Sequence, residues 1–297
     1  MINPHPGLPE LEYVKPTSLK EASQFLADHE GVSKPFAGGT DSFVRLRDGV
    51  LKLDYLVDVK GLNETQGISF DSKNGLTIGA SVTMNQVATH PDVKKHYPNL
   101  AVAANSVASY QLRNRATIIG NICNASPAGD TIGTCLILDG VLKVHGVTGM
   151  RDVPLNTFFL GPGRTTLKPG DVVVSIQLPV PAKGMTGTYK KLGRNIIGDL
   201  SIVGVSVAAY PCKETKSGIR FRIALASVAP IPFESFKAET VLAGAARITD
   251  EVIAEAANAA MDSVTPIDDV RGSAQYRKHM VRNLTREALT EVWKELS

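Results

Sequence analysis

Apolar positions in the first sixty residues change from a helical period to an extended one. Over residues 17–29 the apolar side chains recur every three or four positions, and Ser18 and Glu21 stand at the spacing of a capping box, which predicts a helix. Short apolar runs at 34–37 and 55–59 predict strands. These residues are therefore expected to form one compact unit of the β-α-β type.

The next stretch, residues 61–178, mixes short strands with helices. Two apolar runs flank Asn74 and Gly75, a pair that is the strongest short signal for a β-hairpin. Thr83 and Gln86 repeat the capping spacing and predict the start of a helix. The elements predicted here are strands at 68–70, 76–78, 141–145 and 172–176, and helices beginning at 83 and spanning 100–108 and 131–138.

Pro179 and Pro181 interrupt this pattern, and the remainder of the chain differs in style. Two long alternating strands come first and helices follow, which indicates α+β packing and not a parallel βαβ array. The strands are predicted at 202–210 and 219–226, and the helices at 235–242, 250–261 and 273–296. We therefore expect three units, at 1–60, 61–178 and 179–297.

Composition is that of an ordinary globular protein. The chain has 297 residues, 43% of them hydrophobic, enough for two or three cores. Its 32 basic and 29 acidic residues are intermixed, so neither nucleic acid nor a membrane surface is expected as a partner. The start, residues 1–7, lacks the pattern of a signal peptide, and no stretch is apolar enough to span a bilayer. A cytoplasmic protein without membrane insertion is expected.

Cysteine and histidine spacing argues against a metal centre on this chain. The three cysteines, Cys123, Cys135 and Cys212, include no Cys-x-x-Cys pair. Three thiols cannot ligate an iron–sulfur cluster alone. The six histidines show neither His-x-His nor His-x-x-x-His spacing, so no zinc site is expected.

Two glycine-containing segments, residues 35–41 and 117–127, are the strongest chemical signal. A phosphate needs several converging backbone N–H groups, and Gly38 and Gly39 lack the Cβ atoms that would keep the chain away. Thr40 adds a hydroxyl donor beside them. Either segment alone is also typical of an ordinary turn. The pair indicates one diphosphate-bearing ligand held between two loops.

Motifs of other nucleotide sites are absent from the sequence. It contains neither the G-x-G-x-x-G of a Rossmann dinucleotide site nor the G-x-x-x-x-G-K-[ST] of a P-loop. It also lacks the G-x-S-x-G elbow of serine hydrolases. The diphosphate must be held in another way.

Five motifs follow one another along the chain: AGGT at 37–40, RNRATIIGN at 113–121, ASPAGD at 125–130, GPG at 161–163 and YRKHM at 276–280. In this order they resemble the FAD-binding subunit of molybdenum hydroxylases, the relatives of xanthine dehydrogenase and carbon monoxide dehydrogenase. The resemblance covers essentially the whole chain. It implies an α+β fold, with two FAD-binding subdomains of the vanillyl-alcohol-oxidase (PCMH) type at 1–60 and 61–178. A C-terminal α+β domain with a small antiparallel sheet and helices is implied at 179–297.

The resemblance further implies one noncovalent FAD, enclosed by the two glycine segments. It assigns Asp130 to the nucleotide end of the cofactor, Val173 to a backbone contact, and Lys190, ahead of Arg194, to the flavin. From the residues alone, Asp130 could instead cap a helix, Val173 could be core, and Lys190 could be a solvated strand residue. The residues implied to bind FAD are Lys34, Pro35, Phe36, Ala37, Gly38, Gly39, Thr40, Asp41, Ser42, Val107, Thr117, Ile118, Gly120, Asn121, Asn124, Asp130, Val173 and Lys190.

One position departs from the family pattern, which has Thr-Ile-Gly-Gly-Asn where this chain has Ile119 at the first glycine. A β-branched side chain resists positive φ. We therefore expect Ile119 to be extended, with the close approach to phosphate left to Gly120.

By the resemblance, this chain is the medium subunit of a heteromer. It would take electrons from [2Fe–2S] clusters on a small subunit, which receives them from a molybdopterin-binding large subunit, and pass them through FAD to an external acceptor. A dimer of heterotrimers is implied. Two alternatives remain open from the sequence: a self-contained flavin reductase of the enolpyruvyl-sugar reductase type, and a non-catalytic FAD-binding scaffold.

Overall fold

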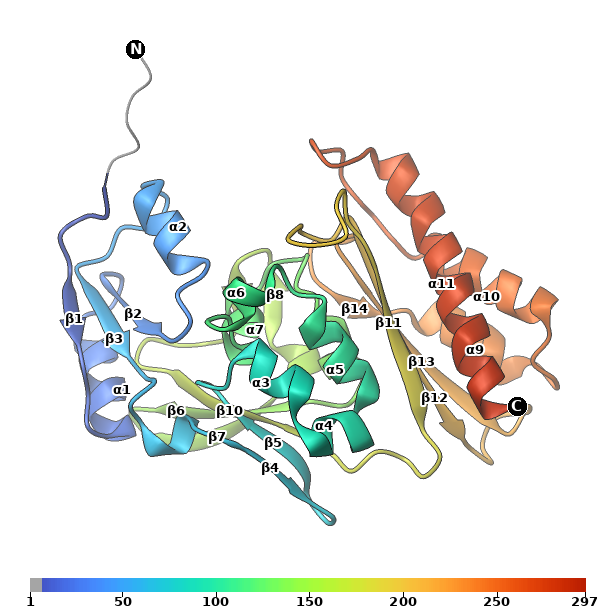
Figure 1. The fold of residues 1–297 in the computed structure, drawn as a ribbon, viewed down its shortest axis with the longest axis horizontal. Coiled ribbons are helices and arrows are strands. Elements are labelled where there is room, and N and C mark those ends of the chain that lie inside the picture. Colours follow the sequence, from blue (N-terminus) through green and yellow to red (C-terminus); the bar gives the residue numbers. More distant parts are fainter. Residues whose placement is uncertain (1–6) are drawn as a thin grey trace.

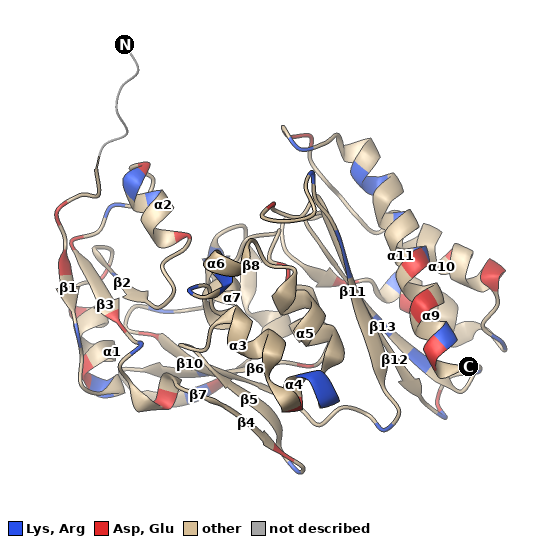
Figure 2. Ribbon diagram, in the orientation of Figure 1, with Lys and Arg blue, Asp and Glu red and all other residues tan. Residues whose placement is uncertain are grey.

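The computed structural model describes residues 7–297, and Figure 1 shows three units that follow one another along the chain. Their sheets have the strand orders β1-β3-β2, β4-β5-β10-β6-β7 and β11-β12-β13-β14. Residues 1–6 of the first expected subdomain lie outside the described part. Lysine and arginine alternate with acidic residues over all three units (Figure 2). The division at residues 60 and 178 stays a prediction.

The first unit is a parallel sheet with two helices: β1 (Glu12–Val14), α1 (Leu19–Asp28), β2 (Ser33–Phe36), α2 (Ser42–Arg47) and β3 (Tyr55–Asp58). Strand β3 pairs in parallel with both β1 and β2, as the β-α-β pattern predicts. The apolar face of α1 packs on β3 and also on Val172 and Val174 of the second unit. The first unit therefore shares a core with the second.

The capping box predicted at α1 is only half present. Ser18 Oγ accepts a hydrogen bond from the Glu21 N–H at 3.2 Å. The Glu21 carboxylate accepts hydrogen bonds from the N–H and hydroxyl of Thr17 and accepts none from the Ser18 N–H. Two hydrogen bonds to Thr17 stabilise the Glu21 carboxylate more than a single hydrogen bond from the Ser18 amide would.

The second unit places six helices over a five-stranded sheet. The strands are β4 (Ile68–Asp71), β5 (Gly75–Gly79), β6 (Val141–Gly146), β7 (Gly149–Pro154) and β10 (Val172–Leu178), with a small hairpin of β8 (Phe159–Gly161) and β9 (Arg164–Thr165). The helices are α3 (Met84–Thr89), α4 (Pro91–His96), α5 (Pro98–Asn105), α6 (Tyr110–Arg113), α7 (Ile118–Asn124) and α8 (Ile132–Ile137). The predicted hairpin is confirmed, with Gly75 at φ +88°. The capping box at Thr83 is complete.

The third unit is an antiparallel sheet followed by helices, as predicted. Its strands are β11 (Thr186–Leu192), β12 (Val203–Pro211), β13 (Ile219–Ala226) and β14 (Phe233–Glu234). Its helices are α9 (Phe236–Gly244), α10 (Asp250–Met261) and α11 (Ala274–Leu296). Strand β11 was not among the predicted elements, because Lys190 and Lys191 interrupt its apolar pattern.

Both faces of the third sheet are buried. Val203, Val205 and Val207 on β12 belong to the core under α9, α10 and α11. Between them, Ser206 and Ala208 face the second unit, where α8 packs against β12 and β13. Small residues on this face allow a close approach, since a Cβ added at Gly133 of α8 would lie 3.1 Å from Ser206 Oγ. The second and third units are thus packed as one body (Figure 1).

Within residues 7–297, no helix combines the length and apolar character needed to cross a bilayer.

Glu239 on α9 gives this packing a pH dependence that can be measured. Its Oε1 accepts a hydrogen bond from the Ile223 N–H at 2.8 Å, and burial raises its pKa to about 7. The folded protein then binds more protons than the unfolded chain between pH about 4.5 and about 7. Stability contributed at this site is therefore present at low pH and lost as pH rises through that window.

We expect Glu239→Gln to remove this loss, because glutamine keeps an acceptor for Ile223 and carries no charge. At pH 8 the variant should be more stable than the unsubstituted protein by about 1–3 kcal/mol in urea unfolding, and at pH 4.5 the difference should vanish. The exposed Glu255→Gln serves as the control. A difference that is the same at both pH values would contradict the assignment.

Candidate functional site

The first glycine segment is a turn between the end of β2 and the start of α2. Gly39 has φ +75°, and α2 begins at Ser42. Within the described chain, no backbone or side-chain acceptor takes the N–H groups of residues 38–42. Several unpaired amides on one tight turn form a concavity suited to an anion. This is the arrangement that a phosphate requires.

The two glycines do different work in this turn. A Cβ added at Gly39 would lie 2.6 Å from the Phe36 ring, so a side chain at this position would collide with Phe36. The predicted approach of Gly39 to a phosphate stays a prediction. The Phe36 ring makes a cation–π contact with Lys60, whose Nζ lies 4.4 Å from the ring centroid, and an edge contact with Tyr13. The turn therefore rests on an ordered aromatic base.

The second glycine segment is not a loop: it consists of helix α7 with its N-cap and the turn that follows the helix. Thr117 is its N-cap, and Thr117 Oγ1 accepts the Gly120 N–H at 2.9 Å. The prediction that Ile119 is extended is wrong: Ile119 is helical and its side chain is buried. A β-branched residue is acceptable in a first helical turn, and its apolar side chain gains from burial in the core. Because Thr117 takes the Gly120 amide, the amides of Ile118 and Ile119 are the ones left without an acceptor at the start of α7 among the described residues.

Gly38 of the first segment touches the backbone just before the second segment. A Cβ added there would overlap the carbonyl oxygen of Arg115 and lie 2.8 Å from its carbonyl carbon and 3.1 Å from Ala116 Cα. Glycine is thus needed for the backbones of the first and second units to meet. The contact brings the turn close to the residues that lead into α7. That both segments enclose one diphosphate stays a prediction.

Positive charge gathers at this junction. Desolvation lowers the pKa of Lys34, and the nearby Arg45 guanidinium lowers it further. Burial raises the pKa of Asp41, and the nearby positive charge of Arg45 opposes this rise. Neither Lys34 nor Arg45 forms an ion pair with a carboxylate in the described part of the chain. Arg45 was not predicted, because nothing in the sequence separates it from other surface arginines of a helix.

The remaining predicted residues lie at varying distances from the junction. Asn121 Oδ1 accepts a hydrogen bond from Thr131 Oγ1 at 2.8 Å, and Asn124 is the last residue of α7. Val107 packs against the hydrophobic core of the second unit, and its carbonyl accepts a hydrogen bond from Arg113. Val173 is buried in β10, which carries a bulge at this point. Their contact with FAD stays a prediction.

Asp130 does not cap α8, whose N-cap is Thr131, a residue that makes no side-chain capping hydrogen bond. Its carboxylate instead binds Tyr189 and Lys191 of β11. Lys190 points to the other face of the sheet, where its Nζ pairs with Glu287 at 3.0 Å and Glu291 at 2.5 Å of α11. The structure therefore does not bring Lys190 together with the other predicted residues. Strand alternation would have singled out Lys191 had β11 been recognised.

Arg194 also lies apart from the junction. It is half exposed on the connection between β11 and β12, where it pairs with Asp199.

The Ala-Ser-Pro-Ala-Gly-Asp segment, residues 125–130, is the joint between the second and third units. The Ala125 carbonyl accepts the Gly163 N–H at 3.0 Å, and the Pro127 carbonyl accepts the Ser227 N–H at 2.7 Å. The Ala128 carbonyl accepts a hydrogen bond from Ser201 at 3.4 Å. The segment that follows α7 is thus fixed from both sides.

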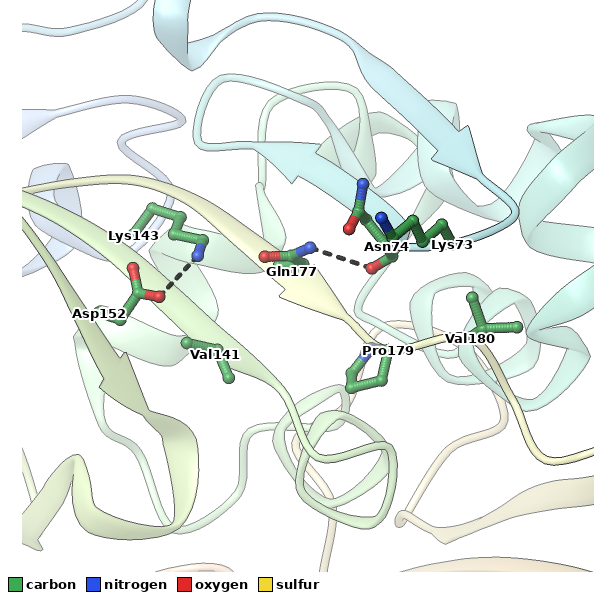
Figure 3. Close-up of a pocket in the computed structure, with 8 residues that line it drawn as sticks. All are labelled: Lys73, Asn74, Val141, Lys143, Asp152, Gln177, Pro179 and Val180. Atoms are coloured by element: carbon green, nitrogen blue, oxygen red, sulfur yellow. Dashed lines mark hydrogen bonds and ion pairs between the residues drawn. The ribbon is translucent and has the colours of Figure 1, made fainter.

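A pocket of about 300 Å³ lies elsewhere (Figure 3). It is lined by Lys73, Asn74, Val141, Lys143, Asp152, Gln177, Pro179 and Val180. Among these residues, Lys143 and Asp152 form an ion pair at 2.7 Å, and Gln177 donates to the Asn74 carbonyl. No lining residue belongs to either glycine segment, so this pocket is not the diphosphate site. Within residues 7–297, no three His, Cys, Asp or Glu side chains are arranged to hold a metal ion.

Comparison with known proteins agrees with this architecture. The family described as the FAD binding domain in molybdopterin dehydrogenase matches residues 9–181, and the CO dehydrogenase flavoprotein C-terminal domain matches residues 187–292. The carbon monoxide dehydrogenase medium chain of Hydrogenophaga pseudoflava is 33% identical over 96% of this chain and 98% of its own. A putative xanthine dehydrogenase FAD-binding subunit of Escherichia coli is 31% identical over 94% of each chain.

Solved structures show the same fold. The carbon monoxide dehydrogenase of Hydrogenophaga pseudoflava that lacks the Mo-pyranopterin moiety superposes with a TM-score of 0.92 at 32% identity, over 97% of this chain and 99% of the other. Quinoline 2-oxidoreductase of Pseudomonas putida gives 0.88 at 27% identity, over 98% and 99%.

The fold and the contacting glycine segments define an FAD-binding flavoprotein with a C-terminal domain of the CO dehydrogenase type. The chain belongs to the family of FAD-binding subunits of molybdenum hydroxylases and is an oxidoreductase subunit. The predicted family and fold class are confirmed. The residues at the junction fit the cofactor, because unpaired amides and two unpaired cations suit the negative charge of a diphosphate.

Gly38→Ala should separate the two segments and release FAD. Its Cβ cannot be accommodated without moving the backbone at Arg115, and overpacking of this kind costs about 1–3 kcal/mol. We expect the dissociation constant for FAD to rise about tenfold or more, measured by titration of the apoprotein with flavin fluorescence as readout. The control is Gly61→Ala, where a Cβ meets nothing within 4 Å. Unchanged affinity in Gly38→Ala would show that the contact does not organise the site.

Proposed function

We propose that this chain is the medium subunit of a molybdenum hydroxylase, which accepts electrons from [2Fe–2S] clusters of a partner subunit and passes them through FAD to an external acceptor. The observation that carries the proposal is the contact of Gly38 with the backbone just before α7 in a chain of this family. Relatives that align over nearly their full length are named medium chains or FAD-binding subunits of dehydrogenases. A subunit name implies partners.

The chain's own residues support a role in holding the cofactor. The amides of residues 38–42 would bind the diphosphate, and Lys34 and Arg45 would offset its charge. Thr117 would keep the start of α7 in place beneath it. When bound, FAD supplies the redox chemistry, and the protein contributes placement and electrostatics.

The electrons must come from another chain. Cys123, Cys135 and Cys212 are free thiols on separate elements, and a usual cluster needs four thiolates. We therefore expect a [2Fe–2S] subunit and a molybdopterin-binding subunit as partners, in a dimer of heterotrimers. A lasting interface of this kind buries about 2,000 Å² or more. A cytoplasmic location is part of the same proposal.

The test is anaerobic flavin reduction with the complex dissected. The chain purified alone with FAD should show no loss of flavin absorbance when candidate aldehydes, N-heterocycles or thioesters are added. Restoring both partners should make reduction depend on substrate, and omitting the [2Fe–2S] subunit should abolish it.

Other outcomes identify the rival functions. Substrate-dependent flavin reduction by the isolated chain would contradict the proposal and favour a self-contained reductase. Flavin that stays oxidised in the complete complex, while the iron–sulfur clusters are reduced, would favour a scaffold.

A further inference from the structure

The turn of residues 38–42 is folded against two aromatic rings. Phe36 ends β2 and Phe43 lies in the first turn of α2, and their rings meet edge to face with the centroids 5.2 Å apart. A Cβ added at Gly39, which lies between them in sequence, would stand 2.6 Å from the Phe36 ring and 3.2 Å from the Phe43 ring. The path of the turn therefore follows the surface of this ring pair.

The hydrophobic core beneath the turn is small. Its buried residues are Phe36, Leu46, Leu53 and Leu56, and they form a cluster separate from the core under α1. Segments that rest on few buried apolar contacts are the ones that open most readily. Phe36 is the member of this cluster that lies against Gly39, so the position of its ring determines the shape of the turn.

Three polar side chains, those of Tyr13, Asp58 and Lys60, form a closed set of hydrogen bonds beside this ring. Asp58 lies opposite Phe36 on β3, and its Oδ2 accepts a hydrogen bond from Tyr13 Oη at 2.7 Å. Its Oδ1 accepts hydrogen bonds from Lys60 Nζ at 2.5 Å and from the Lys60 N–H at 2.9 Å. Lys60 Nζ also donates to Tyr13 Oη at 2.9 Å. Each of the three side chains is thus bound to the other two.

This polar cluster holds Phe36 through both its ring and its backbone. Lys60 Nζ lies 4.4 Å from the ring centroid, and the Tyr13 ring meets it edge to face with the centroids 5.8 Å apart. The Phe36 carbonyl accepts the N–H of Val59, the residue between Asp58 and Lys60, at 3.1 Å. The side chains of Asp58 and Lys60 are 13% and 30% exposed, so solvent screens their charges only in part. Phe36 is therefore held by β1 and by the segment after β3.

We propose that Lys60 and Tyr13 are positioning residues for FAD. Together with Asp58 they hold the Phe36 ring, and through that ring they keep the turn of residues 38–42 in the shape in which its free amides converge on the diphosphate. The proposal rests on the binding of FAD by this turn and not on the electron route proposed above, so its test needs no partner subunit.

The test is the FAD affinity of the full-length apoprotein, measured by flavin fluorescence. Lys60→Met keeps the stem of the side chain and removes the cation, and it should raise the dissociation constant about five- to tenfold. Lys60→Arg should restore most of the affinity, because arginine keeps both the charge and a contact with the ring. Tyr13→Phe removes only the hydroxyl that joins Asp58 and Lys60 and should raise the dissociation constant about threefold.

A double-mutant cycle shows whether Lys60 acts through the ring. Phe36→Leu removes the ring and keeps an apolar side chain for the core. In that background Lys60→Met should cause less than about a twofold further loss, because the group on which Lys60 acts is gone. Tyr13→Phe leaves Phe36 in place and removes no charge, so it decides the question even if Phe36→Leu does not fold.

Two further variants are measured in parallel. Lys143→Met breaks a similar ion pair, with Asp152 at 2.7 Å, and the Lys143 side chain is 29% exposed (Figure 3). It lies in neither glycine segment, and the variant should keep FAD affinity within about twofold of the unsubstituted protein. Gly38→Ala reports whether the turn binds the cofactor at all.

The contradicting results are distinct from one another. Unchanged affinity in Gly38→Ala would remove the turn from the cofactor site, and the proposal would fall with it. Weakened binding in Gly38→Ala but not in Lys60→Met, with only the melting temperature of the Lys60→Met apoprotein lowered, would leave the site intact and make the polar cluster purely structural. An equal loss from Lys60→Met with and without the Phe36 ring would show that Lys60 acts on the cofactor directly or through its charge.

Discussion

The site depends on one close approach, that of Gly38 to the backbone of Arg115 and Ala116. Residues far apart in the sequence meet there, one in the turn after β2 and the others just before α7. Any side chain at position 38 would force the two units apart. Everything proposed for the cofactor follows from this contact, because it sets the free amides of the turn beside the first turn of a helix.

A second constraint concerns the third sheet, which is covered on both faces. Valines on β12 point to its own helices, and serine and alanine between them point to α8. The joint at residues 125–130 adds backbone hydrogen bonds to both Gly163 and Ser227. The packing of the C-terminal domain and the geometry of the segment after α7 therefore depend on each other.

Much of the fold could be predicted from the sequence because its strongest signals are local. The hairpin at Asn74 and Gly75, the cap at Thr83 and helix α10 all follow from spacing within a few residues. The turn at Gly38 and Gly39 was likewise visible. The conformation of Ile119 could not be predicted in this way, because a glycine-containing stretch is typical of a loop, whereas the Thr117 cap here begins a helix.

The direction of side chains was harder to predict than the position of elements. Lys190 and Lys191 are adjacent and chemically equal, and only the register of β11 assigns one to α11 and the other to Asp130. The partners of Asp130 lie about sixty residues away in sequence. No local pattern could show that its carboxylate is used by a neighbouring unit.

The most direct test of the central claim is a crystal structure of the chain with FAD bound. We predict the diphosphate within hydrogen-bonding distance of the amides of residues 38–42 and of the start of α7, with Gly38 still packed on Arg115. A diphosphate bound away from either segment, or a site in which the two segments have moved apart, would contradict the account.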